Sequence, residues 1–397
     1  MDQSNPTEVP VSSAAESPNI RRAAWLVWIF LAISICLVVQ FGKDRSATGS
    51  YRTAVESWFS GEPLYNMEGT GFIYLPQAAI VYAPWGFAPK PLGELLWRLA
   101  MLGILAAGVF RWTRFSTSDD RWFLITSIVA AAMAAGCARS GQSTLMITGL
   151  MILAATDLGE KRWWRATVFL ILAMAFKPLA IVLLLIAAAV YYRPMIWRLA
   201  IGMIALAALP FLTQSPGYVI SQYEAAYQNF VIAFSLGETG MWAQFFGMLK
   251  VAGLDLSSNI QQVIRLIFAM GALIGCWQAA RKLSPERCVF YLFALSACYL
   301  MLFNSRTEGS TYAMVGPVYG FLLAQTWLQY RDKIATIGFL SAIVATTFSF
   351  ELALLVTPRP NHVWLSPFVC VIMTAVIVRH LIGELGSLTP APDTAEL

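Results

Sequence analysis

The sequence predicts an all-α protein that crosses a membrane many times, and two observations support this fold class. Of its 397 residues, 58% are apolar and only 12% are charged, and the mean hydropathy is +0.63. A typical soluble protein has about twice that charged fraction, so this chain cannot cover several soluble domains with solvated surface. The apolar residues also fall into about twelve stretches, most of them long enough to cross a bilayer as helices.

The first stretch, residues 23–41, follows Arg21 and Arg22 and lacks the features of a cleavable signal. It predicts an uncleaved helix that starts in the cytoplasm. The stretches on either side of Lys177-Pro178 are shorter than a straight span needs, so they form either a broken pair or one long kinked helix. The other stretches lie near residues 92–110, 122–138, 143–159, 163–176, 179–192, 195–213, 259–281, 288–303, 310–329, 334–356 and 364–384.

The topology depends on residues 72–89, an apolar stretch interrupted by three prolines. We predict that this stretch lies along the outer face, or dips into it, without crossing. All the basic clusters between spans then fall on the cytoplasmic side, as the positive-inside rule requires. These clusters are Arg111/Arg114/Arg121, Lys161/Arg162/Arg165, Arg193/Arg198, Arg281/Lys282/Arg287 and Arg331/Lys333.

This topology gives one membrane domain, residues 23–385, with long outer segments at residues 43–91 and 214–258. The polar tails, residues 1–22 and 386–397, are predicted to be disordered and cytoplasmic. Functional side chains often sit on loops that a rigid scaffold positions, so we expect the site on the outer face.

The first outer segment contains an amphipathic pattern. Tyr51, Ala54, Val55, Trp58 and Phe59 follow helical spacing and form one apolar stripe. The pattern predicts either a helix on the membrane surface or an ordinary connecting helix.

Several charged residues lie near or within apolar stretches, where charge is costly. Glu94 and Arg98 are four residues apart and are predicted to pair with each other. Lys177 has no acidic residue within a turn, so it either binds an anionic ligand such as a phosphate or extends its side chain to the membrane interface. Arg139 and Arg306 lie in two other outer turns, and the three cations are predicted to converge on one anionic group.

Composition also disfavours other classes of function. The net charge of +5 is small and its basic residues form no single stripe, so no nucleic-acid partner is expected. The six cysteines lie in apolar runs without a C-x-x-C pair, which favours buried packing over disulfides or a zinc site. The sequence contains neither a Gly-rich phosphate loop nor a D-x-D motif, which disfavours a nucleotide-sugar donor.

Five short motifs follow one another along the chain. They are Tyr51-Arg52-x-Ala54, Gly61-Glu62-Pro63-Leu64-Tyr65, Phe72-Ile73-Tyr74-Leu75-Pro76, Gly141-Gln142-Ser143 and Lys177-Pro178. In this order and spacing they resemble glycosyltransferase family 87, also called DUF2029, and the resemblance covers roughly residues 23–330. This family has the GT-C type of all-α fold and is similar to polyprenyl-phosphate-mannose-dependent transferases of bacterial envelopes.

The resemblance implies a hexosyltransferase of the bacterial plasma membrane. Its donor would be a polyprenyl-phosphate sugar, its acceptor a lipid or glycan hydroxyl on the non-cytoplasmic face, and the transfer would invert the anomeric carbon. Asp44 then becomes the catalytic base, and Lys177, Arg139 and Arg306 bind the donor phosphate. Tyr51, Arg52, Trp58, Tyr74, Gln142 and Glu308 are assigned to the sugar and acceptor cleft. No ligand cluster has recognisable spacing, so neither a metal nor another cofactor is expected.

The sequence departs from the family pattern at two places. The family's acid commonly precedes the Tyr of Y-R-x-A by four residues, a position that Ala47 occupies here, whereas Asp44 lies seven residues before Tyr51. Other acids, Glu56, Glu62, Glu68 or Glu308, therefore stay open as the base. The family's Asn-Gln-Ser of the later loop is replaced by Ala243-Gln244-Phe245.

A secondary transporter or lipid flippase is the alternative class, because the chain combines about twelve segments with broken helices and buried charges. Transporters are commonly built from two similar halves, and residues 23–213 and 259–384 show no convincing repeat. A scaffold without catalytic activity is a third possibility.

Overall fold

The computed structural model describes residues 17–42 and 46–387, and this part of the chain contains helices and no strand. The α-helices are α1 (Pro18–Phe41), α2 (Thr48–Ser60), α3 (Pro76–Gly86), α4 (Lys90–Ser116), α5 (Asp120–Ser140), α6 (Thr144–Gly159), α7 (Trp163–Phe176), α8 (Ile181–Val190), α9 (Tyr192–Ala208), α10 (Pro216–Thr239), α11 (Phe245–Val251), α12 (Ser258–Lys282), α13 (Pro285–Phe303), α14 (Gly316–Ala324), α15 (Lys333–Thr347), α16 (Ser349–Leu354) and α17 (Leu365–Gly386). Shorter 3₁₀ segments are η1 (Pro178–Ala180), η2 (Leu209–Leu212), η3 (Gly309–Val315) and η5 (Asn361–Trp364), and η4 (Gln325–Tyr330) is a π-helix.

Within the described residues, seven helical segments are long and apolar enough to cross a membrane. They are Pro18–Phe41, Lys90–Ser116, Asp120–Ser140, Tyr192–Leu212, Ser258–Lys282, Pro285–Phe303 and Asn361–Gly386. Four shorter apolar helices accompany them, near residues 144–159, 163–176, 178–190 and 333–347. The predicted all-α, multi-pass membrane protein is confirmed, whereas the number of twelve spans stays a prediction.

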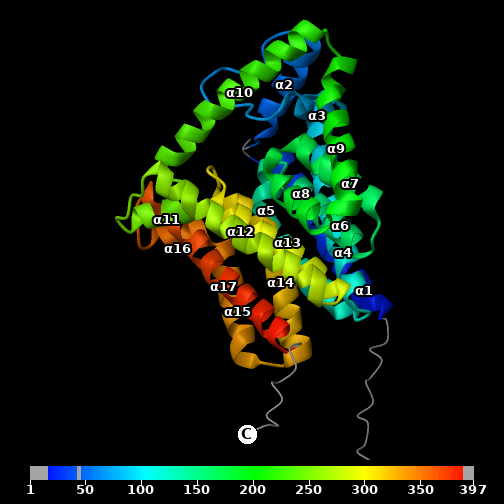
Figure 1. Ribbon diagram of the computed structural model, residues 1–397, viewed down its shortest axis with the longest axis vertical. Helices are drawn as coiled ribbons and strands as arrows, with labels where there is room; N and C mark the ends of the chain where they lie inside the picture. The colour runs from blue at the N-terminus through cyan, green and yellow to red at the C-terminus, as the bar shows by residue number, and fades with distance from the viewer. Residues whose placement is uncertain (1–16, 43–45, 388–397) are drawn as a thin grey trace, which may run out of the picture.

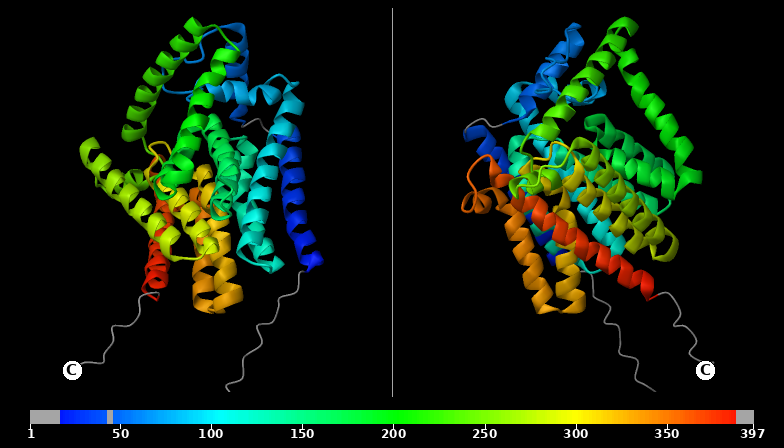
Figure 2. Two further views of the ribbon diagram at one scale, coloured as in Figure 1. Left: turned by 45° about the vertical axis from the view of Figure 1, so that its right-hand side comes forward. Right: turned by 60° about the vertical axis from the view of Figure 1, so that its left-hand side comes forward.

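The two ends of the molecule differ in structure. Helices α2, α3 and α10 gather at one end, and the start of α1 and the end of α17 lie at the other (Figures 1 and 2). Ion pairs join helix ends away from α2, with Arg111 bound to Asp157 and Glu160, and Arg287 bound to Glu384. The bundle helices thus carry at one end a group of loops, the shorter helices α2 and α3, and the 24-residue helix α10.

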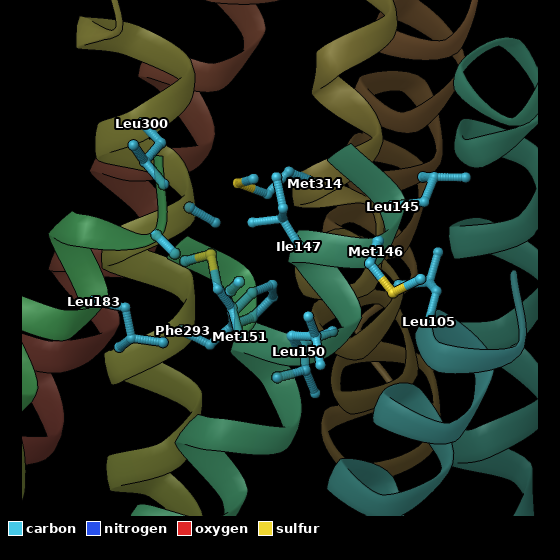
Figure 3. Packing of buried hydrophobic residues seen from close by; sticks show 14 of the residues in the cluster. Leu105, Leu145, Met146, Ile147, Leu150, Met151, Leu183, Phe293, Leu300 and Met314 are labelled. Carbon is cyan, nitrogen blue, oxygen red and sulfur yellow. The ribbon is translucent and has the colours of Figure 1, made fainter. Parts of the chain in front are cut away.

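Helix α6 is the centre of the packed core. Every residue from Thr144 to Leu158 is buried, as expected for a helix that is apolar all round. Figure 3 shows Ile147 and Met151 of α6 between Leu105 of α4 and Phe293 of α13. Because α6 is covered on all sides, the turn before it is held in a fixed place.

Helices α4 and α6 approach closely at Gly149, and we expect this glycine to be required for stability. A Cβ at Gly149 would lie 2.7 Å from backbone atoms of Ile104 and Leu105, which cannot move aside as a flexible side chain would. Gly149→Ala should therefore lower the free energy of unfolding by about 1–3 kcal/mol. Gly103→Ala on α4 is the matched control, because a Cβ there meets nothing within 4 Å. Thermal unfolding in detergent measures both variants, and equal midpoints would contradict the expectation.

The stretch of residues 72–89 forms one short helix. Helix α3 has 11 residues and so spans about 16 Å, roughly half the hydrocarbon core of a bilayer. It begins at Pro76, whose ring suits the first turn of a helix, and it includes Pro84. This length agrees with the prediction that the stretch does not cross the membrane.

The residues of the predicted amphipathic pattern form α2, and the apolar stripe of this helix is covered by protein, while its place on the outer face stays a prediction. Tyr51, Ala54, Val55 and Trp58 are buried, and α2 packs against α3. Only Phe59 of the predicted stripe is substantially exposed, at 41%. The stripe therefore holds α2 on its neighbours, and it is not free to lie on lipid.

The chain breaks at Lys177, which decides between the two alternatives for this region. Helix α7 ends at Phe176, Lys177 is extended with φ −161° and ψ 132°, and Pro178 begins η1 before α8. A residue before proline is disfavoured in the helical region, so Pro178 ends α7 there. The two short stretches are a broken pair, and the break presents the Lys177 side chain at a helix end.

Candidate active site

A polar cavity of about 230 Å³ is lined by residues of α2, of the segment that precedes α3 and of several loops. Residues from six separate segments line it, so none of the segments forms the cavity alone. The lining residues are Ala47, Ser50, Tyr51, Thr70, Gly71, Ile73, Tyr74, Gln142, Lys177, Trp242, Arg306, Glu308 and Thr311. Six of the residues predicted for the site therefore meet in one cavity: Tyr51, Tyr74, Gln142, Lys177, Arg306 and Glu308.

Gln142 and Glu308 meet on one wall of the cavity. Gln142 follows Gly141, whose left-handed φ of 68° ends α5 and turns the chain into α6. The Gln142 Nε2 atom donates a hydrogen bond to Glu308 Oε2 at 2.6 Å. The Ser310 hydroxyl donates to Gln142 Oε1 at 3.3 Å, which fixes the orientation of the amide.

Two tyrosines form a second wall. The hydroxyls of Tyr51 and Tyr74 are 3.2 Å apart, and Tyr51 is 3.5 Å from the Ser143 hydroxyl. Burial raises the pKa of both phenols, and the nearby Glu308 charge raises the pKa of Tyr74 further. Both tyrosines therefore stay protonated at neutral pH and can donate hydrogen bonds to a ligand.

Lys177 and Arg306 provide the positive charge of the cavity. The Lys177 Nζ lies 5.8 Å from the centre of the Tyr74 ring, and within the described part of the chain Lys177 forms no ion pair. Arg306 donates from Nη1 to the Gly69 carbonyl at 2.6 Å and stacks on Trp242, with its Cζ 4.8 Å from the ring centre. Two cations held in this way suit an anionic ligand.

A second, mostly apolar groove of about 410 Å³ adjoins the polar cavity. The two share Ile73, Tyr74, Lys177 and Arg306, so both cations stand where the groove meets the cavity. The rest of the groove comes chiefly from α10, from η1 at Leu179 and from the loop at Asn304. Its other lining residues are Pro178, Leu179, Tyr227, Phe230, Val231, Ala233, Phe234, Asn304 and Ser305.

Three residues predicted for the site line neither the cavity nor the groove. Arg52 donates from Nη1 to the Trp85 and Ala88 carbonyls at the end of α3. Trp58 is fully buried and donates from Nε1 to Thr213 Oγ1 at 3.0 Å. Arg139 is absent from the lining of both, and its convergence with the other cations is not seen among the described side chains. Arg52 and Trp58 connect the outer segments to one another.

The Glu94–Arg98 ion pair is confirmed, and it forms part of a buried network beside the cavity. Glu94 also accepts hydrogen bonds from Thr48 and Ser46 at the start of α2. Arg98 donates from Nη2 to the Arg139 carbonyl at 2.9 Å, at the end of α5. The network therefore fixes two cavity segments relative to α4.

The predicted base, Asp44, lies outside the described residues. The chain is described again from Ser46, and the Ala47 amide donates to the Ser140 carbonyl at 2.8 Å. Ala47 lines the cavity, so the position where the resemblance expects an acid faces the site without one. Within the described ranges, no group of three His, Cys, Asp or Glu side chains has the arrangement of a metal site.

The sequence interpretation missed Trp242, Ser50, Thr70 and Thr311. Trp242 follows α10 in the second outer segment, and the Ala243 amide donates to the Thr307 carbonyl at 2.8 Å, which brings this segment to the Arg306 loop. The only available signal was a tryptophan in a long outer loop, which does not identify its partner.

The fold and the cavity define a helical membrane protein with a concave polar site, the kind of site that binds a small molecule or the polar part of a larger one. This chain belongs to glycosyltransferase family 87, because the model of that family matches residues 72–305. The matched residues include Tyr74, Gln142 and Lys177, which meet at the cavity. No curated protein matches the chain. The predicted family is confirmed, and the protein is a membrane glycosyltransferase.

Proposed function

We propose that the protein transfers a sugar, a hexose such as mannose, from a polyprenyl-phosphate donor to a lipid or glycan hydroxyl, with inversion. The observation that supports this proposal most directly is the position of Lys177 and Arg306, which line both the polar cavity and the apolar groove. The groove, the two cations and the cavity follow the same order as the parts of a polyprenyl-phosphate sugar, which are an apolar chain, a charged phosphate and a polar ring.

Each part of this donor matches one surface of the groove and cavity. The isoprenoid chain lies along Phe230, Val231 and Phe234 of α10, where apolar contact is favourable. The phosphate lies between Lys177 and Arg306, which neutralise it as it leaves.

The sugar occupies the polar cavity. Tyr51 and Tyr74 offer hydroxyl donors and ring faces, and Gln142 contributes an amide. Such a lining suits a sugar, because the faces of its ring are apolar and its rim is polar.

The distribution of basic residues supports the proposal that the cavity faces the non-cytoplasmic side of the membrane. Arg111 lies near the end of α4 and Arg287 near the start of α13, and these helix ends lie away from α2 and α3 (Figure 1). Cytoplasmic loops carry an excess of basic residues. This distribution favours a cavity on the non-cytoplasmic face and cytoplasmic termini, as in a bacterial plasma membrane.

Transfer from a panel of radiolabelled polyprenyl-phosphate sugars tests the function. The purified protein in lipid vesicles should move label from at least one hexose donor to a membrane lipid or glycan acceptor. Absence of transfer from every donor, together with uptake of substrate into the vesicles, would instead support the transporter alternative.

The groove predicts a dependence on the length of the donor lipid. Val231 is 55% exposed and lines the groove, so Val231→Asp places a charge against the isoprenoid chain. We expect the KM for a long-chain donor to rise roughly tenfold, which is about 1.4 kcal/mol. A water-soluble short-chain donor should be unaffected.

Gln228→Asp is the matched control, because Gln228 is exposed on the same helix and lines neither the groove nor the cavity. Equal KM changes in the two variants, or an equal change for the short-chain donor, would contradict an isoprenoid site in this groove.

A further inference from the structure

Glu308 has a distinctive place among the acids of the outer segments. It is the one carboxylate among the described residues that line the polar cavity. Glu56, Glu62 and Glu68 line neither the cavity nor the groove. A proton released within the cavity therefore has a single described carboxylate available to accept it.

One oxygen of Glu308 is held and the other is free. Oε2 accepts the hydrogen bond from Gln142, whose amide is oriented by Ser310. Oε1 has no hydrogen-bond partner among the described residues, and Glu308 forms no ion pair there. The carboxylate is thus oriented by a neutral group, and its second oxygen is available to a substrate hydroxyl.

The cations and Glu308 also occupy different positions along the site. Lys177 and Arg306 line both the groove and the cavity, whereas Glu308 and Gln142 line the cavity alone. In an inverting displacement the acceptor attacks the anomeric carbon from the side opposite the leaving phosphate. A base for that acceptor is needed in the cavity and not along the donor lipid, and Glu308 lines the cavity but not the groove.

We propose that Glu308 is the general base of the transfer, an inference that rests on the proposed function. The acceptor oxygen forms a bond to the anomeric carbon as the bond from that carbon to the phosphate oxygen breaks. The electron pair of the broken bond stays on the lipid phosphate, between Lys177 and Arg306. The acceptor proton passes to Glu308 Oε1, and Gln142 keeps the carboxylate oriented.

The test compares Glu308→Gln with the wild type in vesicles that contain the active donor and acceptor. Glu308→Gln should lower kcat by about 100- to 10,000-fold, the range for a general base, with the donor KM within about threefold. Glu308→Asp should recover part of the activity, because it restores a carboxylate. Glu224→Gln is the control for the same chemical change, since Glu224 is exposed on α10 and lines neither the groove nor the cavity.

Three outcomes would overturn the inference. Glu308→Gln that retains wild-type kcat would show that another group takes the proton, and loss of activity in Asp44→Asn alone would identify that group as Asp44. A rise in KM without a fall in kcat would show that Glu308 only binds substrate. Absence of transfer by the wild type itself would instead reject the proposed function, and the base assignment with it.

Discussion

Lys177→Ala should lower kcat/KM for sugar transfer by about 100- to 1000-fold. Negative charge develops on the donor phosphate as the glycosidic bond breaks, and a fixed cation stabilises that charge more than it stabilises the ground state. Lys177 stands at the junction of groove and cavity, and no carboxylate of the described residues pairs with it. Steady-state transfer with the active donor measures the effect.

Two further variants separate charge from structure. Lys177→Arg keeps the positive charge and should retain more activity than Lys177→Ala. Lys333→Ala removes an exposed lysine at the start of α15 and should leave transfer unchanged. Activity of Lys177→Ala within threefold of the wild type, at an unchanged thermal midpoint, would exclude Lys177 from the phosphate site.

Features that depend on short stretches of sequence could be predicted. The helices follow from runs of apolar residues, because the bilayer requires backbone groups to be satisfied within each segment. The break at Lys177 follows from Pro178, and the Glu94–Arg98 pair follows from helical spacing. Each of these depends on residues within a turn or two of one another.

The assembly of the cavity could be predicted only in part. Gln142 and Glu308 are 166 residues apart in the chain, and nothing in their local sequences indicates that they form a hydrogen bond. Membership of a motif also did not distinguish the residues that line the cavity from the residues that hold the outer segments together. Arg52 belongs to a family motif and Trp58 lies between two motifs, yet Trp58 donates to Thr213 and Arg52 donates to carbonyls at the end of α3. The direction of a side chain depends on long-range packing, which the position of a motif does not determine.

Arg98→Ala should lower the free energy of unfolding by about 3–5 kcal/mol, because it leaves the Glu94 carboxylate buried without its partner. Arg98 is 1% exposed and Glu94 is 6% exposed, so water cannot replace the lost guanidinium at little cost. Arg121→Ala is the matched control: it breaks an exposed ion pair with Asp119 and should cost less than about 1 kcal/mol. Unfolding in detergent, followed by helix content, measures both variants.

The double variant Glu94→Gln/Arg98→Met distinguishes an unpaired charge from lost packing, because it removes both charges and keeps similar volumes. It should recover much of the stability that Arg98→Ala loses. Transfer should stay impaired in the double variant, since Arg98 also donates to Ser46 and to the Arg139 carbonyl, next to the segments that carry Ala47 and Gln142. Recovery of both stability and transfer would mean that the network is not needed to position the cavity, whereas recovery of stability alone would separate its two roles.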